Sequence, residues 1–103
     1  MNENLTPEQA ALRFRLSKNL KKLRAAQKIS QEALADRAGL HRTYVSQVER
    51  MVTNASLDNI CLLAVALESD PATLFAATVE QSERQEEAEH PSNKKARRAT
   101  TKI

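Results

Sequence analysis

Side chains that can make paired hydrogen bonds gather between positions 41 and 47 of this 103-residue chain. Arg42 carries a planar fork of N–H donors that fits two acceptors on a guanine, and the Gln47 amide offers the donor and acceptor that fit adenine. Thr43 adds a methyl group that can rest on a thymine methyl. The sequence offers no nucleophile–base pair, metal-ligand cluster or phosphate-cradling glycine loop, so it favours recognition over enzymatic catalysis.

The spacing of these residues indicates one face of a short helix. Arg42 and Ser46 are four residues apart, and so are Thr43 and Gln47, so all four lie on neighbouring positions of a helical surface. Two valines fall on the opposite side and would face a core. We therefore predict a helix over about residues 42–50, and the candidates for base contacts are His41, Arg42, Thr43, Ser46 and Gln47.

A second short helix must hold the first in place. Ser30 is a favourable N-cap, and Leu34, Ala35 and Ala38 after it share one helical face. Gly39 follows where a chain leaving a helix often needs a positive φ. Two helices joined by a short glycine-containing turn, the second with a polar face, form a helix-turn-helix, whose second helix enters the major groove of DNA.

A family resemblance rests on these same residues. The stretch QEALADRAGLHRTYVSQVER (31–50), with SLDNICLLAVALESDPATLF (56–75) behind it, resembles the lambda-repressor-like (XRE-type) helix-turn-helix regulators. The resemblance covers roughly residues 16–76, and among the subgroups it is greatest to the controller proteins of restriction-modification systems. It implies an all-α, compact five-helix lambda-repressor-like DNA-binding domain that regulates transcription.

The resemblance also assigns roles outside the base-reading face. Gln31 matches a family position that touches a phosphate, and Arg24 and Glu49 match a structural ion pair between the first helix and the recognition helix. Tyr44 either contacts the sugar-phosphate backbone or covers the edge of the core, and the residues leave both open. The candidates for DNA backbone contacts are Gln31, Tyr44, Arg50 and Asn54.

At four positions the chain departs from the family pattern. His41 stands where the family usually has Ser or Thr, so a DNA contact and a pH-sensitive cap are both open. Lys28, Met51 and Glu68 stand at helix ends where the family commonly has glycine. Either these three residues adopt the left-handed conformation, at ~1 kcal/mol each, or the helices end differently here.

The remaining helices form the scaffold. Thr6–Gln9 combines a capping threonine, a first-turn proline and a capping-box glutamine, and it begins a helix that runs to about Gln27. The expected inner stripe of that helix is Leu12, Leu16, Leu20 and Leu23. Ser56 caps a helix so apolar that it should be nearly surrounded at the centre of the core. Asp70 and Pro71 should begin a fifth helix.

The fifth helix is also the candidate dimer contact. A domain of ~60–75 residues buries only about 60% of its unfolded surface, so association would help to stabilise it. Each chain has one recognition helix, and two-fold dimers bind half-sites about 34 Å apart. The candidate dimer residues are Leu74, Phe75 and Val79, and the alternative is that they complete the core of a monomer.

Composition sets the remaining expectations. The net charge of +3 and pI of about 9.3 are compatible with double-stranded DNA as a partner, and the single cysteine excludes an internal disulfide. We expect no metal, cofactor, small-molecule ligand or membrane contact, and a cytoplasmic location. Residues 1–5 should be a flexible N-terminus, 6–79 the domain, and 80–103 a charged tail that is disordered or partly helical. An antitoxin-type module whose tail binds a protein partner while the helix-turn-helix binds its operator is the alternative function.

Overall fold

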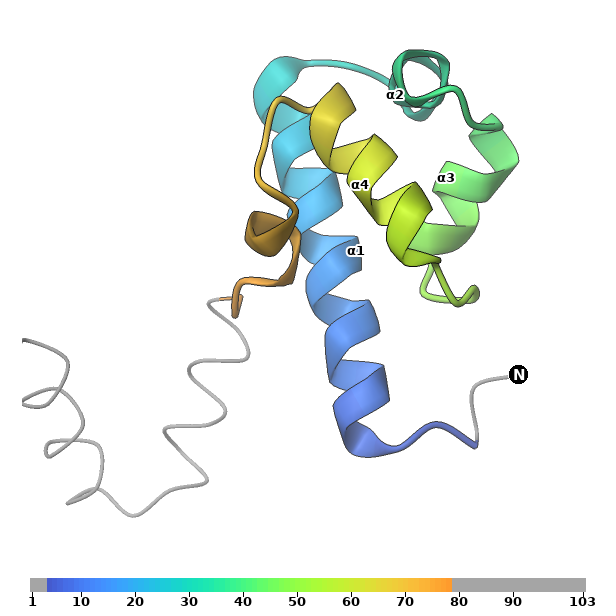
Figure 1. Cartoon of the computed structure of the whole chain (residues 1–103), viewed down its shortest axis with the longest axis vertical. Helices are drawn as coiled ribbons and strands as arrows, with labels where there is room; N and C mark the ends of the chain where they lie inside the picture. The colour runs from blue at the N-terminus through green and yellow to red at the C-terminus, as the bar shows by residue number, and fades with distance from the viewer. Residues whose placement is uncertain (1–3, 79–103) are drawn as a thin grey trace, which may run out of the picture.

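A computed structural model describes residues 4–78, which form four α-helices and one short 3₁₀ helix (Figure 1). The elements are α1 Pro7–Gln27, α2 Gln31–Ala38, α3 Arg42–Glu49, α4 Leu57–Ala66 and η1 Pro71–Phe75. No strand occurs within residues 4–78, in agreement with the all-α prediction. The predicted tail 80–103, the dimer candidate Val79 and residues 1–3 of the predicted N-terminus lie outside the described residues.

The helices begin at the predicted caps. Thr6 and Gln9 form a complete capping box, with a bond of 2.9 Å from the Thr6 N–H to the Gln9 amide oxygen and one of 3.1 Å from the Gln9 N–H to the Thr6 hydroxyl. Ser30 and Ser56 each accept a hydrogen bond from the backbone N–H three residues further on. Each cap satisfies one of the N–H groups that a helix leaves unpaired at its start.

Among residues 4–78, four adopt the left-handed conformation. Gly39 ends α2 with φ of 72°, which costs a glycine little. Lys28, Met51 and Glu68 have φ of 57°, 63° and 56°. The chain therefore keeps the helix ends that glycine would give and accepts roughly 1–2 kcal/mol of backbone strain at each of the three.

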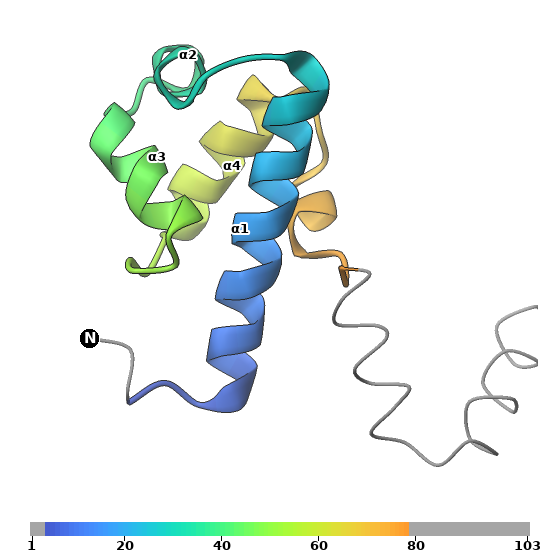
Figure 2. The same ribbon diagram turned by 180° about the vertical axis from the view of Figure 1, so that it is seen from behind.

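The long helix α1 is the axis of the fold. Helix α3 and η1 lie on opposite sides of α1, and α2 and α4 close the space between α1 and α3 (Figures 1 and 2). All four α-helices or their ends and η1 contribute completely buried apolar side chains to the core, α1 through its C-terminal half. The largest of these side chains are Leu20, Leu34, Val45, Leu63, Leu67 and Leu74. This shared core fixes the angle at which α3 is held.

The predicted fifth helix is a 3₁₀ helix of only five residues, and contacts with α1 explain its early end. The Asn19 amide donates to the Leu74 and Ala76 carbonyls, both at 3.0 Å. These bonds satisfy the carbonyls at the end of η1, and the backbone at Ala76 is already extended. Leu74 is 0% exposed, so it completes the core of its own chain, whereas Phe75 packs against the core and keeps part of its side chain exposed.

Helix α4 is less enclosed than predicted. Leu57 and Val65 are 79% and 73% exposed, and Leu62 and Cys61 are exposed as well. The core needs only the side of α4 that carries Ile60, Leu63 and Ala64, so apolar residues on the other side remain uncovered. We call this outer set the α4 stripe: Leu57, Cys61, Leu62 and Val65.

The predicted leucine stripe of α1 is also only partly buried. Leu16 and Leu20 are buried and Leu23 packs against the core, whereas Leu12 is exposed because the first turns of α1 extend beyond the other helices (Figure 1). Within residues 4–78, no helix has both the length and the hydropathy to cross a bilayer.

Candidate nucleic-acid interface

Helix α3 has two sharply different sides. Val45 and Val48 are buried in the core, which fixes the rotation of the helix about its axis. The opposite side carries all the predicted base-contact residues. His41, Arg42 and Thr43 at its N-terminal end are exposed, and Ser46 and Gln47 one turn later are half-buried. The five side chains are thus presented together by a helix that the core holds rigidly.

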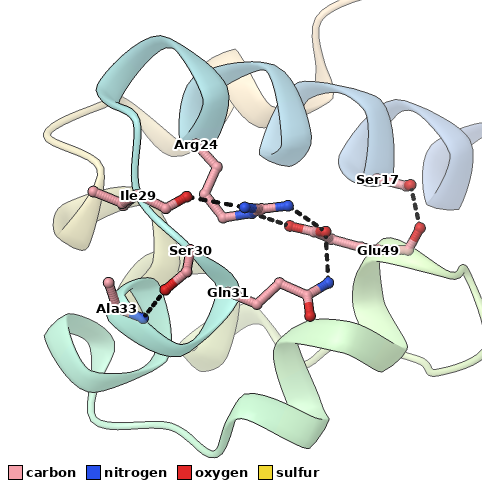
Figure 3. A network of polar contacts seen from close by, with 7 residues as sticks. All are labelled: Ser17, Arg24, Ile29, Ser30, Gln31, Ala33 and Glu49. Atoms are coloured by element: carbon pink, nitrogen blue, oxygen red, sulfur yellow. Dashed lines mark hydrogen bonds and ion pairs between the residues drawn. The ribbon is translucent and has the colours of Figure 1, made fainter.

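An ion pair joins the C-terminal end of α3 to α1. The Arg24 guanidinium donates from Nε to one carboxylate oxygen of Glu49 at 2.8 Å and from Nη2 to the other at 3.0 Å. Its Nη1 donates to the Ile29 carbonyl at 2.9 Å (Figure 3). This two-bond geometry is the strong form of an arginine–carboxylate pair. The pair therefore fastens α3 to α1 and to the loop before α2.

Two further bonds to Glu49 complete the network. The Gln31 amide donates from Nε2 to a Glu49 carboxylate oxygen at 2.9 Å, and the Ser17 hydroxyl donates to the Glu49 backbone carbonyl at 2.6 Å (Figure 3). Glu49 is 3% exposed, so the bonds from Arg24 and Gln31 replace the water that its carboxylate would otherwise hold. The role of Ser17 was not predicted, because nothing in the sequence around one serine on a leucine-bearing helix indicates a partner 32 residues away.

Glu49 also shifts the pKa of its partner. Its hydrogen bonds, and less strongly its negative charge, raise the pKa of the Arg24 guanidinium, and together they outweigh the lowering that burial causes. A group whose pKa is raised by folding contributes stability below its unfolded pKa and loses it only as pH rises past the folded value. Arg24 therefore stays charged from acid to well above neutral pH.

The network also orients Gln31. Its amide nitrogen faces Glu49 while its amide oxygen points away (Figure 3). A primary amide has two N–H groups, so one N–H and the oxygen remain for another partner. Gln31 lies at the first position of α2, where the unpaired backbone N–H groups of a helix start favour an anion.

The sequence profile of the HTH_3 helix-turn-helix family matches residues 20–74, from the second half of α1 to η1. The chain belongs to the HTH_3 helix-turn-helix family. It is a DNA-binding regulator, and the matched segment contains α2, α3 and the three side chains Arg24, Gln31 and Glu49.

Several individual proteins are similar to this chain in sequence and structure. Control protein C.SmaI of Serratia marcescens is 43% identical over 60 residues, which are 58% of this chain and 71% of C.SmaI. The crystal structure of the restriction-modification controller protein C.AhdI of Aeromonas hydrophila is similar with a TM-score of 0.59 and 46% identity, over 61% of this chain and 96% of that one. The crystal structure of the hypothetical transcription factor NHTF from Neisseria is similar with a TM-score of 0.66 and 38% sequence identity. The match covers 77% of this chain and 91% of NHTF.

The other predicted DNA-facing residues of this HTH_3 chain differ in their surroundings. Arg50 and Asn54 are exposed, and Arg50 donates from Nε to the Ser46 hydroxyl at 3.3 Å. His41 is the N-cap residue of α3 but makes no side-chain cap bond, so the structure does not show the pH-sensitive cap. The His41 imidazole therefore projects at the start of α3 without a capping role.

Tyr44 is partly buried and packs against the core, which is the second of the two positions predicted for it, at the edge of the core. Its hydroxyl oxygen is buried without a hydrogen-bond partner in the described part of the chain. A buried hydroxyl of this kind destabilises the fold by about 1–3 kcal/mol relative to one that is paired. A contact to the DNA backbone would therefore require the ring to turn outward.

We expect Tyr44→Phe to leave the folded domain as stable as before or to stabilise it by about 1 kcal/mol, because the substitution removes only the unpaired hydroxyl. Thermal unfolding followed by circular dichroism measures this. Tyr44→Leu is the control, since it removes the ring as well and should lower the melting temperature. A fall in melting temperature for Tyr44→Phe would show that the hydroxyl has a stabilising partner.

Proposed function

We propose that this chain is a sequence-specific transcriptional regulator of the restriction-modification controller type, which binds a two-fold symmetric operator as a homodimer with α3 in the major groove. One observation carries the proposal. The side of α3 opposite Val45 and Val48 consists of hydrogen-bonding side chains, and a partly buried ion pair fastens the end of that helix. Rigid presentation of such side chains is what base recognition requires.

The base-reading part of the proposal assigns a partner to each side chain by its chemistry. Arg42 is exposed and carries the donor fork that fits the O6 and N7 acceptors of guanine. Gln47 fits adenine, and the Thr43 methyl group fits thymine. His41 and Ser46 complete the face, at the start and the middle of α3. Each two-bond contact would discriminate against a wrong base by about 1–3 kcal/mol.

The backbone part of the proposal fixes the register on the duplex. Gln31 would donate its second amide N–H to a phosphate while Glu49 holds the first. Arg50 and Asn54 are exposed beyond the end of α3, where a second phosphate contact would lie. Contacts of this kind add affinity without sequence preference and weaken as salt increases.

For the dimer contact we propose the exposed apolar side of α4 in place of the residues at and after η1. Leu74 is buried in its own chain, Phe75 packs on the core and Val79 lies outside the described residues, so the α4 stripe is the better supported surface. It is apolar, continuous along one side of a helix and uncovered. A second copy of the same stripe would cover it, since a two-fold interface brings identical patches together.

We expect Leu62→Asp to convert the dimer to a monomer, because a charge would then face the apolar surface of the partner chain. Truncating a central interface residue costs about 2 kcal/mol or more, or roughly 30-fold in the dimer dissociation constant. Sedimentation equilibrium measures the mass directly. Val52→Asp is the matched control, since Val52 is an exposed apolar residue outside α4. An unchanged mass for Leu62→Asp would exclude the α4 stripe as the interface.

Selection of bound duplexes from random DNA tests the proposed function itself. The purified full chain should enrich one sequence made of two inverted half-sites about 34 Å apart. The affinity for the enriched duplex should fall with increasing salt while its advantage over a scrambled duplex persists, because phosphate contacts are lost before base contacts. Failure to enrich any sequence would contradict the proposal.

A further inference from the structure

A groove lined by lysines runs along the side of α1 that packs against η1. It has a volume of about 540 Å³, and lysines and small or apolar side chains line it together. The residues that line it are Lys18, Asn19, Lys21, Lys22 and Leu23 on α1 and Thr73, Ala76, Ala77 and Thr78 on the facing segment. We call it the lysine groove.

The lysine groove faces away from the proposed DNA site. It lies between α1 and the segment around η1, while α3 packs on the other side of α1 (Figures 1 and 2). A duplex held by α3 would therefore lie across the molecule from these lysines. Their positive charge needs a different explanation from the one that applies to Arg42.

Two of the lysines have no partner in the described part of the chain. Lys21 and Lys22 are exposed, and neither forms an ion pair or a side-chain hydrogen bond with any of residues 4–78. Arg24, on the next turn of the same helix, forms an ion pair with the Glu49 carboxylate. Lys18 and Lys22 are four residues apart on α1 and both line the groove. Like charges at this helical spacing repel, so an acidic partner beside them would stabilise this part of α1.

The chain itself continues from this groove into an acidic stretch. Thr78 lines the groove and is the last described residue. The sequence after it, VEQSERQEEAE, places five glutamates and a single arginine within residues 80–89. Glu80 is two residues from Thr78, a reach of about 7 Å of extended chain, so the first carboxylates are tethered beside the lysines. A short tether of this kind gives an effective concentration on the order of mM.

We propose that the acidic segment 80–89 occupies the lysine groove of its own chain, with its glutamates paired to Lys21 and Lys22. Exposed ion pairs are individually weak, so the docking depends on several pairs together and on low salt. It covers the apolar lining residues Leu23, Ala76 and Ala77. It also holds the negative charge of the segment on the side of α1 away from α3, where it cannot repel a phosphate backbone. The docking does not depend on the proposed operator or dimer.

Carbodiimide cross-linking of the full-length chain tests this, since the reagent joins an amine to a carboxylate only when the two are in contact. An equal mixture of ¹⁵N-labelled and unlabelled chains is treated at low salt, and the linked peptides are identified by mass spectrometry. We expect links from Lys21 and Lys22 to Glu80, Glu83, Glu86 or Glu87, within one isotope population, and a loss of these links at high salt. Lys28 is the matched control, because it is an exposed lysine of the same helix end that does not line the groove.

Three results would overturn the proposal. Links distributed equally over Lys28 and the groove lysines would show no docking at this site. Links joining labelled to unlabelled chains would assign the groove to a second copy. A 30-bp duplex that abolishes the Lys21 and Lys22 links would assign the groove to DNA phosphates, whereas links that persist with the duplex present support docking of the acidic segment.

Discussion

Glu49→Ala is expected to lower the melting temperature of the domain by roughly 8 °C or more. The substitution leaves the Arg24 guanidinium without its carboxylate and removes the acceptor of the Gln31 amide. Arg24 is 21% exposed, so water partly compensates its charge and the loss is about 2 kcal/mol or more, below the cost of breaking a fully buried pair. For a domain of this size, 1 kcal/mol shifts the melting temperature by about 4–8 °C. Thermal unfolding followed by circular dichroism measures the shift.

A matched substitution separates the network from a general effect of losing a glutamate. Glu32→Ala removes an exposed carboxylate from the first turn of α2, where its interaction with the helix start is worth about 0.3–1 kcal/mol. Its effect on the melting temperature should be much smaller. At a temperature where Glu49→Ala remains folded, selection from random DNA should enrich the wild-type sequence, because Glu49 faces α1 and not the outer side of α3. A melting temperature unchanged by Glu49→Ala would contradict the structural role.

Arg42→Ala is expected to weaken binding to the selected operator by about 1–3 kcal/mol, or roughly 5- to 150-fold. The loss should be confined to one base pair per half-site, where guanine would no longer be preferred over other bases. Binding to a scrambled duplex should change much less. Fluorescence anisotropy with operators varied at single positions measures both affinity and preference.

Two controls distinguish base recognition from loss of positive charge. Arg42→Lys keeps the charge but not the planar fork, so it should bind the scrambled duplex normally and still lose the guanine preference. Arg37→Ala removes another exposed arginine, from α2, where its side chain donates to the Gln27 amide oxygen. It should leave the base preference intact. Equal losses of preference for Arg37→Ala and Arg42→Ala would show that Arg42 has no special place in recognition.

The sequence predicted what is determined by neighbouring residues. The helix starts at Thr6, Ser30 and Ser56 follow from local capping, and the inward turn of Val45 and Val48 follows from helical spacing. The Arg24–Glu49 pair followed from the family resemblance, and the structure contains it. In each case the information lies within one helix or in a recognisable family pattern.

What the sequence did not predict depends on contacts between distant segments. The end of η1 is set by Asn19, which lies 55 residues before Leu74, so the Asp70–Pro71 start signal could not reveal its length. Helical spacing shows that α4 is apolar, but the number of neighbours available to cover it decides its exposure, and Leu57 and Val65 have too few. The bonds of Glu49 to Ser17 and Gln31 likewise form only after α1, α2 and α3 have packed.

The most direct test of the central claim is an NMR titration of the ¹⁵N-labelled full chain with the selected operator and, separately, with a scrambled duplex of equal length and composition. The claim is that the outer side of α3 reads base edges. It predicts that the operator shifts the backbone and side-chain resonances of residues 41–47 strongly, and that the scrambled duplex shifts them weakly while still shifting Gln31 and Arg50. Identical shifts with the two duplexes, or a largest response away from α3, would contradict it.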